Sequence, residues 1–119
     1  MAFRFEDLKV WHKAVDLSNG IDILRKFPKT ELYNLSSQIK RAADSVVLNI
    51  AEGSTGQSIP GFKRFLDIAL RSAVEVVACL FLAIKRNYFE QTEFKQFYDE
   101  YELLCKMITK LRDSMSKSP

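Results

Sequence analysis

The chain has 119 residues, of which 47% are hydrophobic, and its formal net charge is +3. This composition excludes intrinsic disorder, and the weak positive charge permits a nucleic-acid partner without requiring one. The longest apolar run, Val76–Ile84, is too short to cross a bilayer, and no signal peptide is visible at the N-terminus. We therefore expect one cytoplasmic domain over residues 1–119.

Apolar residues at helical spacing predict a first helix over residues 6–26 and a second over residues 35–52. Phe27-Pro28 ends the first helix, because the residue before a proline is disfavoured in the α region. Gly53 ends the second helix, and residues 53–60 form the one clear loop. The apolar stripe of the second helix consists of Leu35, Ile39, Ala42, Ala43, Val46 and Ile50.

The third helix is predicted over residues 60–87, with Ser58 as its N-cap, and it carries two adjacent apolar stripes. The first stripe comprises Phe62, Leu66, Ala69, Ala73, Val76, Leu80 and Ala83. One seam of a bundle needs only one stripe, so we expect a second subunit to cover the other. Alternatively, this helix is central to its own bundle and bulky neighbours cover it. The candidate interface consists of Val74, Val77, Phe81, Ile84 and Tyr88.

The fourth helix is predicted over residues 92–115, with strictly alternating apolar steps of three and four residues. A period of 3.5 residues favours a left-handed supercoil, and short connections make neighbouring helices antiparallel. The predicted fold class is therefore all-α, an antiparallel up-down-up-down four-helix bundle with a left-handed supercoil. The stripe of this helix consists of Phe94, Phe97, Tyr101, Leu104, Ile108, Leu111 and Met115.

Three segments of the chain together resemble the family of 23S ribosomal RNA intervening-sequence proteins. They read FEDLKVW (5–11), FPKTELYNLSSQIKRAADSVVLNIAEGS (27–54) and FKRFLDIALRSAVEV (62–76), and the most specific part is Gln38–Gly53 with its NIAEG signature. The resemblance implies a small bacterial protein that folds as a four-helix bundle and assembles as a cyclic homopentamer. A related group of bundle proteins, accessory factors of retroelements, binds nucleic acid and a reverse transcriptase, whereas the biochemical role of the family itself is poorly defined.

Two positions depart from the family pattern. Val47 stands where the family usually has a proline, so we expect the second helix to run straighter. Arg71-Ser72 stands where the family usually has Gly-Ser. Either the helices pack differently at this point or Arg71 points outward.

A polar stripe runs along the second helix beside its apolar stripe, and residues of the third helix are placed to face it. The functional interpretation is a binding surface. The structural interpretation, which we favour, is a network of hydrogen bonds and ion pairs that holds the bundle in register. The residues concerned are Gln38, Arg41, Ser45, Asn49, Glu52, Ser72 and Glu75.

Basic residues form small clusters on the second and third helices, and Arg64 and Arg71 are two helical turns apart on one face. Cations presented together attract phosphate, and repetition in an oligomer would multiply a modest patch. We expect weak, salt-sensitive and sequence-nonspecific binding of nucleic acid; the alternative is an ordinary solvated surface. The candidate nucleic-acid-binding residues are Lys40, Arg41, Lys63, Arg64, Arg71, Lys85 and Arg86.

The sequence offers no catalytic or metal-binding set. His12 is the only histidine, so neither a catalytic triad nor a di-iron site can be assembled, and no P-loop motif is present. Cys79 and Cys105 lie on apolar helical faces and are interpreted as small core residues in a reducing compartment.

Aromatic residues of the fourth helix are a second potential nucleic-acid contact, because aromatic rings can stack on bases. Phe94, Phe97 and Tyr101 occupy heptad positions that indicate a core role instead, whereas Tyr98 is left open.

We therefore predict a non-enzymatic, self-assembling helical bundle that either binds nucleic acid (RNA) weakly and without sequence preference or serves as a ribonucleoprotein scaffold. The alternative is a purely protein-binding or structural oligomeric scaffold without nucleic-acid affinity. The expected partners are further copies of the chain, as a pentamer, and RNA or DNA. We expect no cofactor, metal, membrane or small-molecule substrate.

Overall fold

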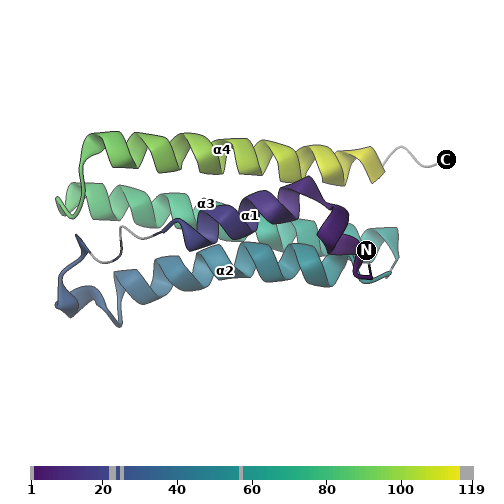
Figure 1. Ribbon diagram of the computed structural model, residues 1–119, viewed down its shortest axis with the longest axis horizontal. Coiled ribbons are helices and arrows are strands. Elements are labelled where there is room, and N and C mark those ends of the chain that lie inside the picture. Colours follow the sequence, from purple (N-terminus) through teal and green to yellow (C-terminus); the bar gives the residue numbers. More distant parts are fainter. Residues whose placement is uncertain (1, 22–23, 25, 57, 116–119) are drawn as a thin grey trace.

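Four α-helices make up the computed structural model, which describes residues 2–21, 24, 26–56 and 58–115. Within these residues the fold is entirely helical, which confirms the predicted all-α four-helix class. The helices lie side by side in an elongated bundle of 50 × 22 × 21 Å (Figure 1). The α-helices are α1 (Lys9–Asn19), α2 (Leu35–Gly53), α3 (Ile59–Lys85) and α4 (Gln91–Ser114), and the 3₁₀ helices are η1 (Arg4–Asp7) and η3 (Lys29–Glu31).

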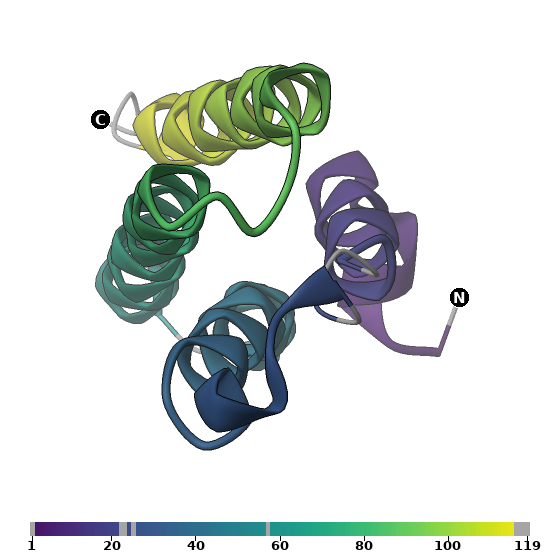
Figure 2. The same ribbon diagram turned by 90° about the vertical axis from the view of Figure 1, so that its left-hand side faces the viewer.

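α2 and α3 run in opposite directions, as their contacts show. Gln38 near the start of α2 is bonded to Glu75 in the second half of α3, whereas Gly53 at the end of α2 lies against Phe65 near the start of α3. Viewed along the bundle, α2, α3 and α4 occupy successive corners and α1 the remaining one (Figure 2). The handedness of the supercoil stays a prediction.

The core is built from the stripes that the heptad pattern predicts. Every residue of the α2 stripe and of the first α3 stripe is buried. In α4, Phe94, Tyr101, Leu104 and Ile108 are buried, and the rest of the stripe is half-buried against them. No α-helix in the described part of the chain combines the length and the hydropathy that a membrane span requires.

The first helix is shorter than the predicted range of 6–26. It begins at Lys9 because Leu8 is extended, with φ −93° and ψ 114°, and separates it from η1. It ends at Asn19, and the Gly20 amide donates to the Asp16 carbonyl at 2.9 Å. Ser, Asn and Gly in succession are weak helix formers, which explains the early stop. Residues 22, 23 and 25 of the predicted helix lie outside the described residues.

The loops that flank α3 follow standard capping chemistry. The Ser58 hydroxyl accepts a hydrogen bond from the Gly61 amide at 3.2 Å, so its predicted N-cap role is confirmed. At the other end Asn87 adopts a left-handed φ of 60°. The amide of Tyr88 then donates to the carbonyl of Ala83, which closes a Schellman motif and turns the chain towards α4.

Candidate nucleic-acid interface

Short polar side chains join α2 to α3 at the middle of the bundle. The hydroxyls of Ser45 and Ser72 are 2.8 Å apart. The Asn49 side-chain amide donates to the carbonyl and the hydroxyl of Ser45, at 2.8 and 3.0 Å. The Gln38 amide reaches the Glu75 carboxylate at 3.4 Å. The structure thus brings together five of the residues assigned to the polar stripe, and their contacts fix how α2 lies along α3.

Arg41 and Glu52 do not belong to this network, which corrects the expectation for both. Each side chain is exposed, and neither makes a side-chain hydrogen bond or an ion pair within the described residues. Both side chains lie at the solvent-exposed edge of α2, and Arg41 lines a groove that α3 residues also line. Their charges are therefore displayed on the surface and are not used to hold the helices together.

The two departures from the family pattern are accommodated without a break in either helix. α2 is continuous through Val47. In α3, Arg71 is exposed while the adjacent Ser72 faces Ser45, so the arginine points outward. The small serine, and not the arginine, occupies the position of close helix approach.

Several of the basic residues are paired with carboxylates. Lys40 forms an ion pair with Asp44 at 3.2 Å, within α2. The guanidinium of Arg86 donates to Glu31 at 2.8 Å. Such pairing offsets the positive charge that an approaching phosphate would meet, so these two residues are weaker phosphate ligands than the sequence suggested.

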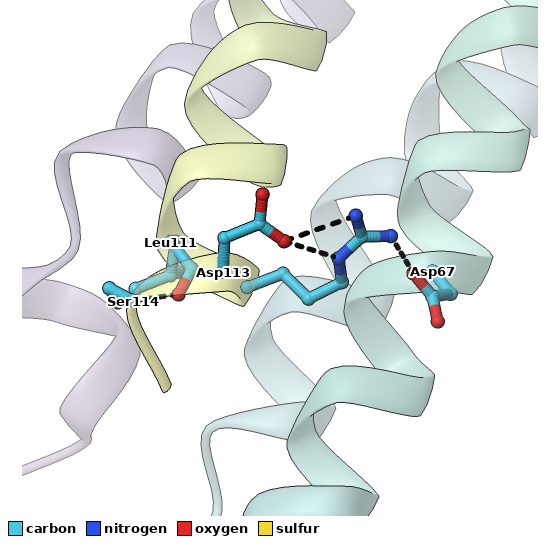
Figure 3. Close-up of polar contacts among 5 residues, drawn as sticks. Asp67, Leu111, Asp113 and Ser114 are labelled. Carbon is cyan, nitrogen blue, oxygen red and sulfur yellow. Dashed lines mark hydrogen bonds and ion pairs between the residues drawn. The ribbon is translucent and has the colours of Figure 1, made fainter. Parts of the chain in front are cut away.

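Arg112 is similarly engaged, at the junction of α3 and α4. Its guanidinium donates to Asp67 at 2.6 Å and to Asp113 at 3.2 Å, and Figure 3 shows the two carboxylates on either side of it. Asp67, followed by Asp113, raises the pKa of Arg112 above its usual value. Arg112 therefore links the two helices and is not available to a ligand.

The unpaired arginines gather on one surface. Arg41, Arg64 and Arg71 are exposed and have no ion pair in the described part of the chain. Arg64 and Arg71 lie about 10 Å apart along α3, on the same side. Arg41 lies between Gln38 and Ser45, so the antiparallel pairing places it level with the Ser72–Glu75 turn of α3. We call the exposed surface formed by these three arginines the α2–α3 face.

The remaining basic candidates, Lys63 and Lys85, are not part of this surface as defined. Lys63 is half-buried and has an interaction partner. Lys85 is exposed near the end of α3, beside a cavity that also contacts Phe89. The acidic residues Glu52 and Glu75 are also exposed here and reduce the net positive charge. Any attraction for phosphate at this face is therefore modest.

Glu31 joins the connection before α2 to the end of α3. It is only 8% exposed, and its carboxylate accepts hydrogen bonds from the Tyr88 hydroxyl at 2.5 Å, Arg86 at 2.8 Å and the Leu35 amide at 3.4 Å. The hydrogen bond from Tyr88, helped by Leu35 and Arg86, lowers the pKa of Glu31 although burial opposes the shift. The same contact raises the pKa of Tyr88.

Glu31→Gln is expected to lower the melting temperature at pH 7 and to lose this effect in acid. A lowered pKa in the folded state means that ionised Glu31 adds stability above its unfolded pKa of about 4.3, and that this contribution is lost as the pH falls through its folded pKa. Thermal unfolding of both proteins at pH 7 and pH 3 measures the difference. Melting curves separated equally at both pH values would contradict the assigned role of the carboxylate.

The apolar stripe proposed as an interface is only partly covered by the bundle itself. Val77 and Ile84 are half-buried against the core, and Tyr88 is held by Glu31. Val74 and Phe81 remain 57% and 46% exposed. We call the surface around these two residues the α3–α4 face.

Aromatic residues of α4 pack beside this surface. The ring of Tyr98, which the sequence left open, contacts the rings of Phe81 and Phe94 at centroid distances of 6.1 and 5.9 Å. Phe94 and Tyr101 are buried and Phe97 is half-buried. The α4 aromatics therefore form part of the core and its edge, and they do not present a free platform for bases.

Neither the single histidine nor the acidic residues form a recognisable reactive centre. The Nε2 atom of His12 is hydrogen-bonded to the Glu6 carbonyl at 2.7 Å. Among the described residues, no three side chains of His, Cys, Asp or Glu are grouped so that they could hold a metal ion. Cys79 is buried and Cys105 half-buried, as expected of core residues, and burial raises the pKa of both thiols.

One prominent surface residue was not singled out from the sequence. Tyr33 is 88% exposed, the highest value among the large hydrophobic residues that the structure describes, and it lies at the end of the α2–α3 face. It falls between the first two predicted helices, residues 6–26 and 35–52, and outside every helical stripe. An aromatic residue in a turn, with no stripe to bury it, was the signal that would have identified it.

Comparisons with known proteins agree with the architecture. The family model described as 23S rRNA-intervening sequence protein matches residues 6–110. A crystal structure of a protein of unknown function from the S23 ribosomal protein family of Bacteroides thetaiotaomicron VPI-5482 superimposes with a TM-score of 0.78 and 27% sequence identity. The match covers 87% of this chain and 95% of the other. A comparison with curated proteins gave no match.

Proposed function

Because this chain belongs to the family of 23S rRNA-intervening sequence proteins, we propose that it binds RNA or other nucleic acid through the α2–α3 face. The observation that supports the proposal is the clustering of unpaired arginines. Arg41, Arg64 and Arg71 share one surface, whereas Lys40, Arg86 and Arg112 are paired with carboxylates. In this proposal the protein is not an enzyme.

The chemistry of the α2–α3 face suits the phosphate backbone better than base edges. Guanidinium groups form strong, two-pronged hydrogen bonds with phosphate oxygens, and phosphate contacts carry little sequence information. If each of the three arginines contacts one phosphate of a single strand, a plot of log binding constant against log salt concentration is expected to have a slope of about −2. The expected interaction is weak, salt-sensitive and nonspecific.

Self-assembly is the second part of the proposal. The α3–α4 face leaves the apolar side chains of Val74 and Phe81 exposed on α3. A further copy would bury this apolar surface, and we propose a cyclic homopentamer, as the family resemblance implies. Such a ring would display several α2–α3 faces, so that weak contacts with one nucleic-acid strand add up.

A gel shift with labelled RNA at about 50 mM salt tests the binding surface. Changing Arg41, Arg64 and Arg71 together to glutamate is expected to weaken binding about tenfold or more, because phosphate attraction becomes repulsion. The matched control changes Lys95, Lys106 and Lys110 of α4 to glutamate. This control makes the same change in net charge on exposed positions elsewhere, and we expect it to bind nearly as the natural protein does.

Equal weakening in both variants would show that net charge alone controls binding and would contradict a specific face. Light scattering of the same samples gives the mass of the assembly. A monomer at micromolar concentration would contradict the proposed self-assembly, but it would not contradict nucleic-acid binding through the α2–α3 face. If the natural protein binds no nucleic acid at low salt, the structural scaffold is the better description.

A further inference from the structure

Among the described residues, the large hydrophobic side chain with the greatest exposure lies two residues after a buried glutamate. Tyr33 lies in the turn between η3 and α2, two residues after Glu31. The Glu31 carbonyl accepts the Asn34 amide at 3.0 Å, and its carboxylate accepts the Leu35 amide at 3.4 Å. The backbone on both sides of Tyr33 is thus fixed to the bundle, while the ring itself projects into solvent.

A groove begins at this ring and runs between α2 and α3. Its volume is about 380 Å³, within the range of ~300–1,000 Å³ that is typical of sites for small molecules. Tyr33 and Leu82 give it apolar walls, and Leu82 is itself 45% exposed. Gln38 and Arg41 add an amide and a guanidinium. A flat aromatic surface beside an unpaired cation matches a nucleotide, which combines a flat base with an anionic phosphate.

Arg41 is the cation available to such a phosphate. Arg86 also lines the groove, but its guanidinium is bonded to Glu31. Arg41 has no acidic partner in the described residues, although Glu75 lines the same groove. Beyond Arg41, the surface continues along α3 past Arg71 to Arg64. The groove therefore lies at one end of the α2–α3 face.

We propose that this groove takes one nucleotide of a single-stranded nucleic acid, with the base stacked on Tyr33 and the phosphate on Arg41. The strand then follows the α2–α3 face towards Arg64. In a duplex the base faces are already stacked on one another, so Tyr33 selects single strands, whereas the arginines attract both forms. This inference rests on the proposed function and adds the class of nucleic acid to it.

Fluorescence anisotropy with two probes tests the inference at about 50 mM salt. One probe is a labelled oligouridylate about 12 nucleotides long, and the other is an RNA duplex of the same length. Tyr33→Ala is expected to weaken oligouridylate binding roughly tenfold and to leave duplex binding unchanged. Tyr33→Phe keeps the ring and is expected to keep the affinity. Leu32→Ala is the matched control, because Leu32 is adjacent, 55% exposed and outside the groove.

Each other outcome overturns a defined part of this account. If Tyr33→Ala binds oligouridylate as the natural protein does, while the triple arginine variant does not, the stacking site is wrong and the proposed function stands. If Tyr33→Ala changes the mass of the assembly in light scattering, the ring belongs to a contact between copies and the stacking site is again wrong. If neither probe binds the natural protein, the proposed function fails, and the stacking site fails with it.

Discussion

Gly53→Ala is expected to lower the free energy of unfolding by about 1–3 kcal/mol, the usual cost of overpacking. A Cβ atom at this position would lie 2.7 Å from the Cβ of Phe65 and 3.0 Å from the ring of Phe62. The Phe65 Cβ is fixed to the α3 backbone, so it cannot rotate away. The end of α2 must therefore move away from α3, which loosens contacts along the adjoining core.

The direction of this change is decisive, because helix propensity alone predicts the opposite. Gly53 is the last residue of α2, and alanine is favoured over glycine in a helix by up to about 1 kcal/mol. Urea unfolding at a fixed protein concentration measures the difference. Glu52→Ala is the control, since its exposed side chain has no ion pair in the described residues, and we expect a change within about 0.5 kcal/mol. A Gly53→Ala variant of greater stability would disprove the close approach of α2 and α3.

Leu104→Ala is expected to cost about 2–5 kcal/mol, which is a large part of the ~5–15 kcal/mol that stabilises a typical domain. Leu104 is fully buried at the centre of α4, so truncation removes apolar contacts and leaves a cavity. Its neighbour Leu103 is 46% exposed and is the matched control. We expect Leu103→Ala to change the free energy of unfolding by less than about 1 kcal/mol.

Comparison of the two leucines tests the register of α4, because the substitution is identical and the positions are adjacent. Chemical denaturation of both variants at the same protein concentration gives the two costs. Similar losses in both variants would mean that α4 is rotated from the described orientation, or that Leu103 is buried between copies. A loss confined to Leu104 agrees with the seam predicted from the heptad pattern.

The predictable part of the fold is the part that depends on local periodicity. The alternation of steps in α3 and α4 predicted which residues are buried, from Phe62 to Ala83 and from Phe94 to Ile108. The end of α1 was missed because the apolar stripe continued past Gly20 to the buried Ile21. The apolar spacing up to Ile21 predicts a helix, but α1 ends at Asn19, and the buried side chain of Ile21 belongs to the segment that follows the helix.

The candidate site was harder to predict, because it depends on contacts between distant parts of the chain. Glu31 and Tyr88 are far apart in sequence, and no local pattern indicates that they meet. The pairing of Arg86 with Glu31, which removes one predicted phosphate ligand, has the same origin. The helical positions of Arg64 and Arg71 were sufficient to place them on one surface, but adding Arg41 and Tyr33 required the alignment of α2 with α3.

The large sequence separation between α1 and α4 bears on the order in which we expect the bundle to be completed. α2, α3 and α4 are joined by short loops, so most of their contacts are local in sequence and form rapidly. α1 reaches α4 through the ion pair of Lys13 with Glu100, which closes a much longer loop at a greater cost in entropy. During translation α1 leaves the ribosome first and has no docking site on α4 until Glu100 has been synthesised. We therefore expect the α2–α3 face to form before α1 docks on α4.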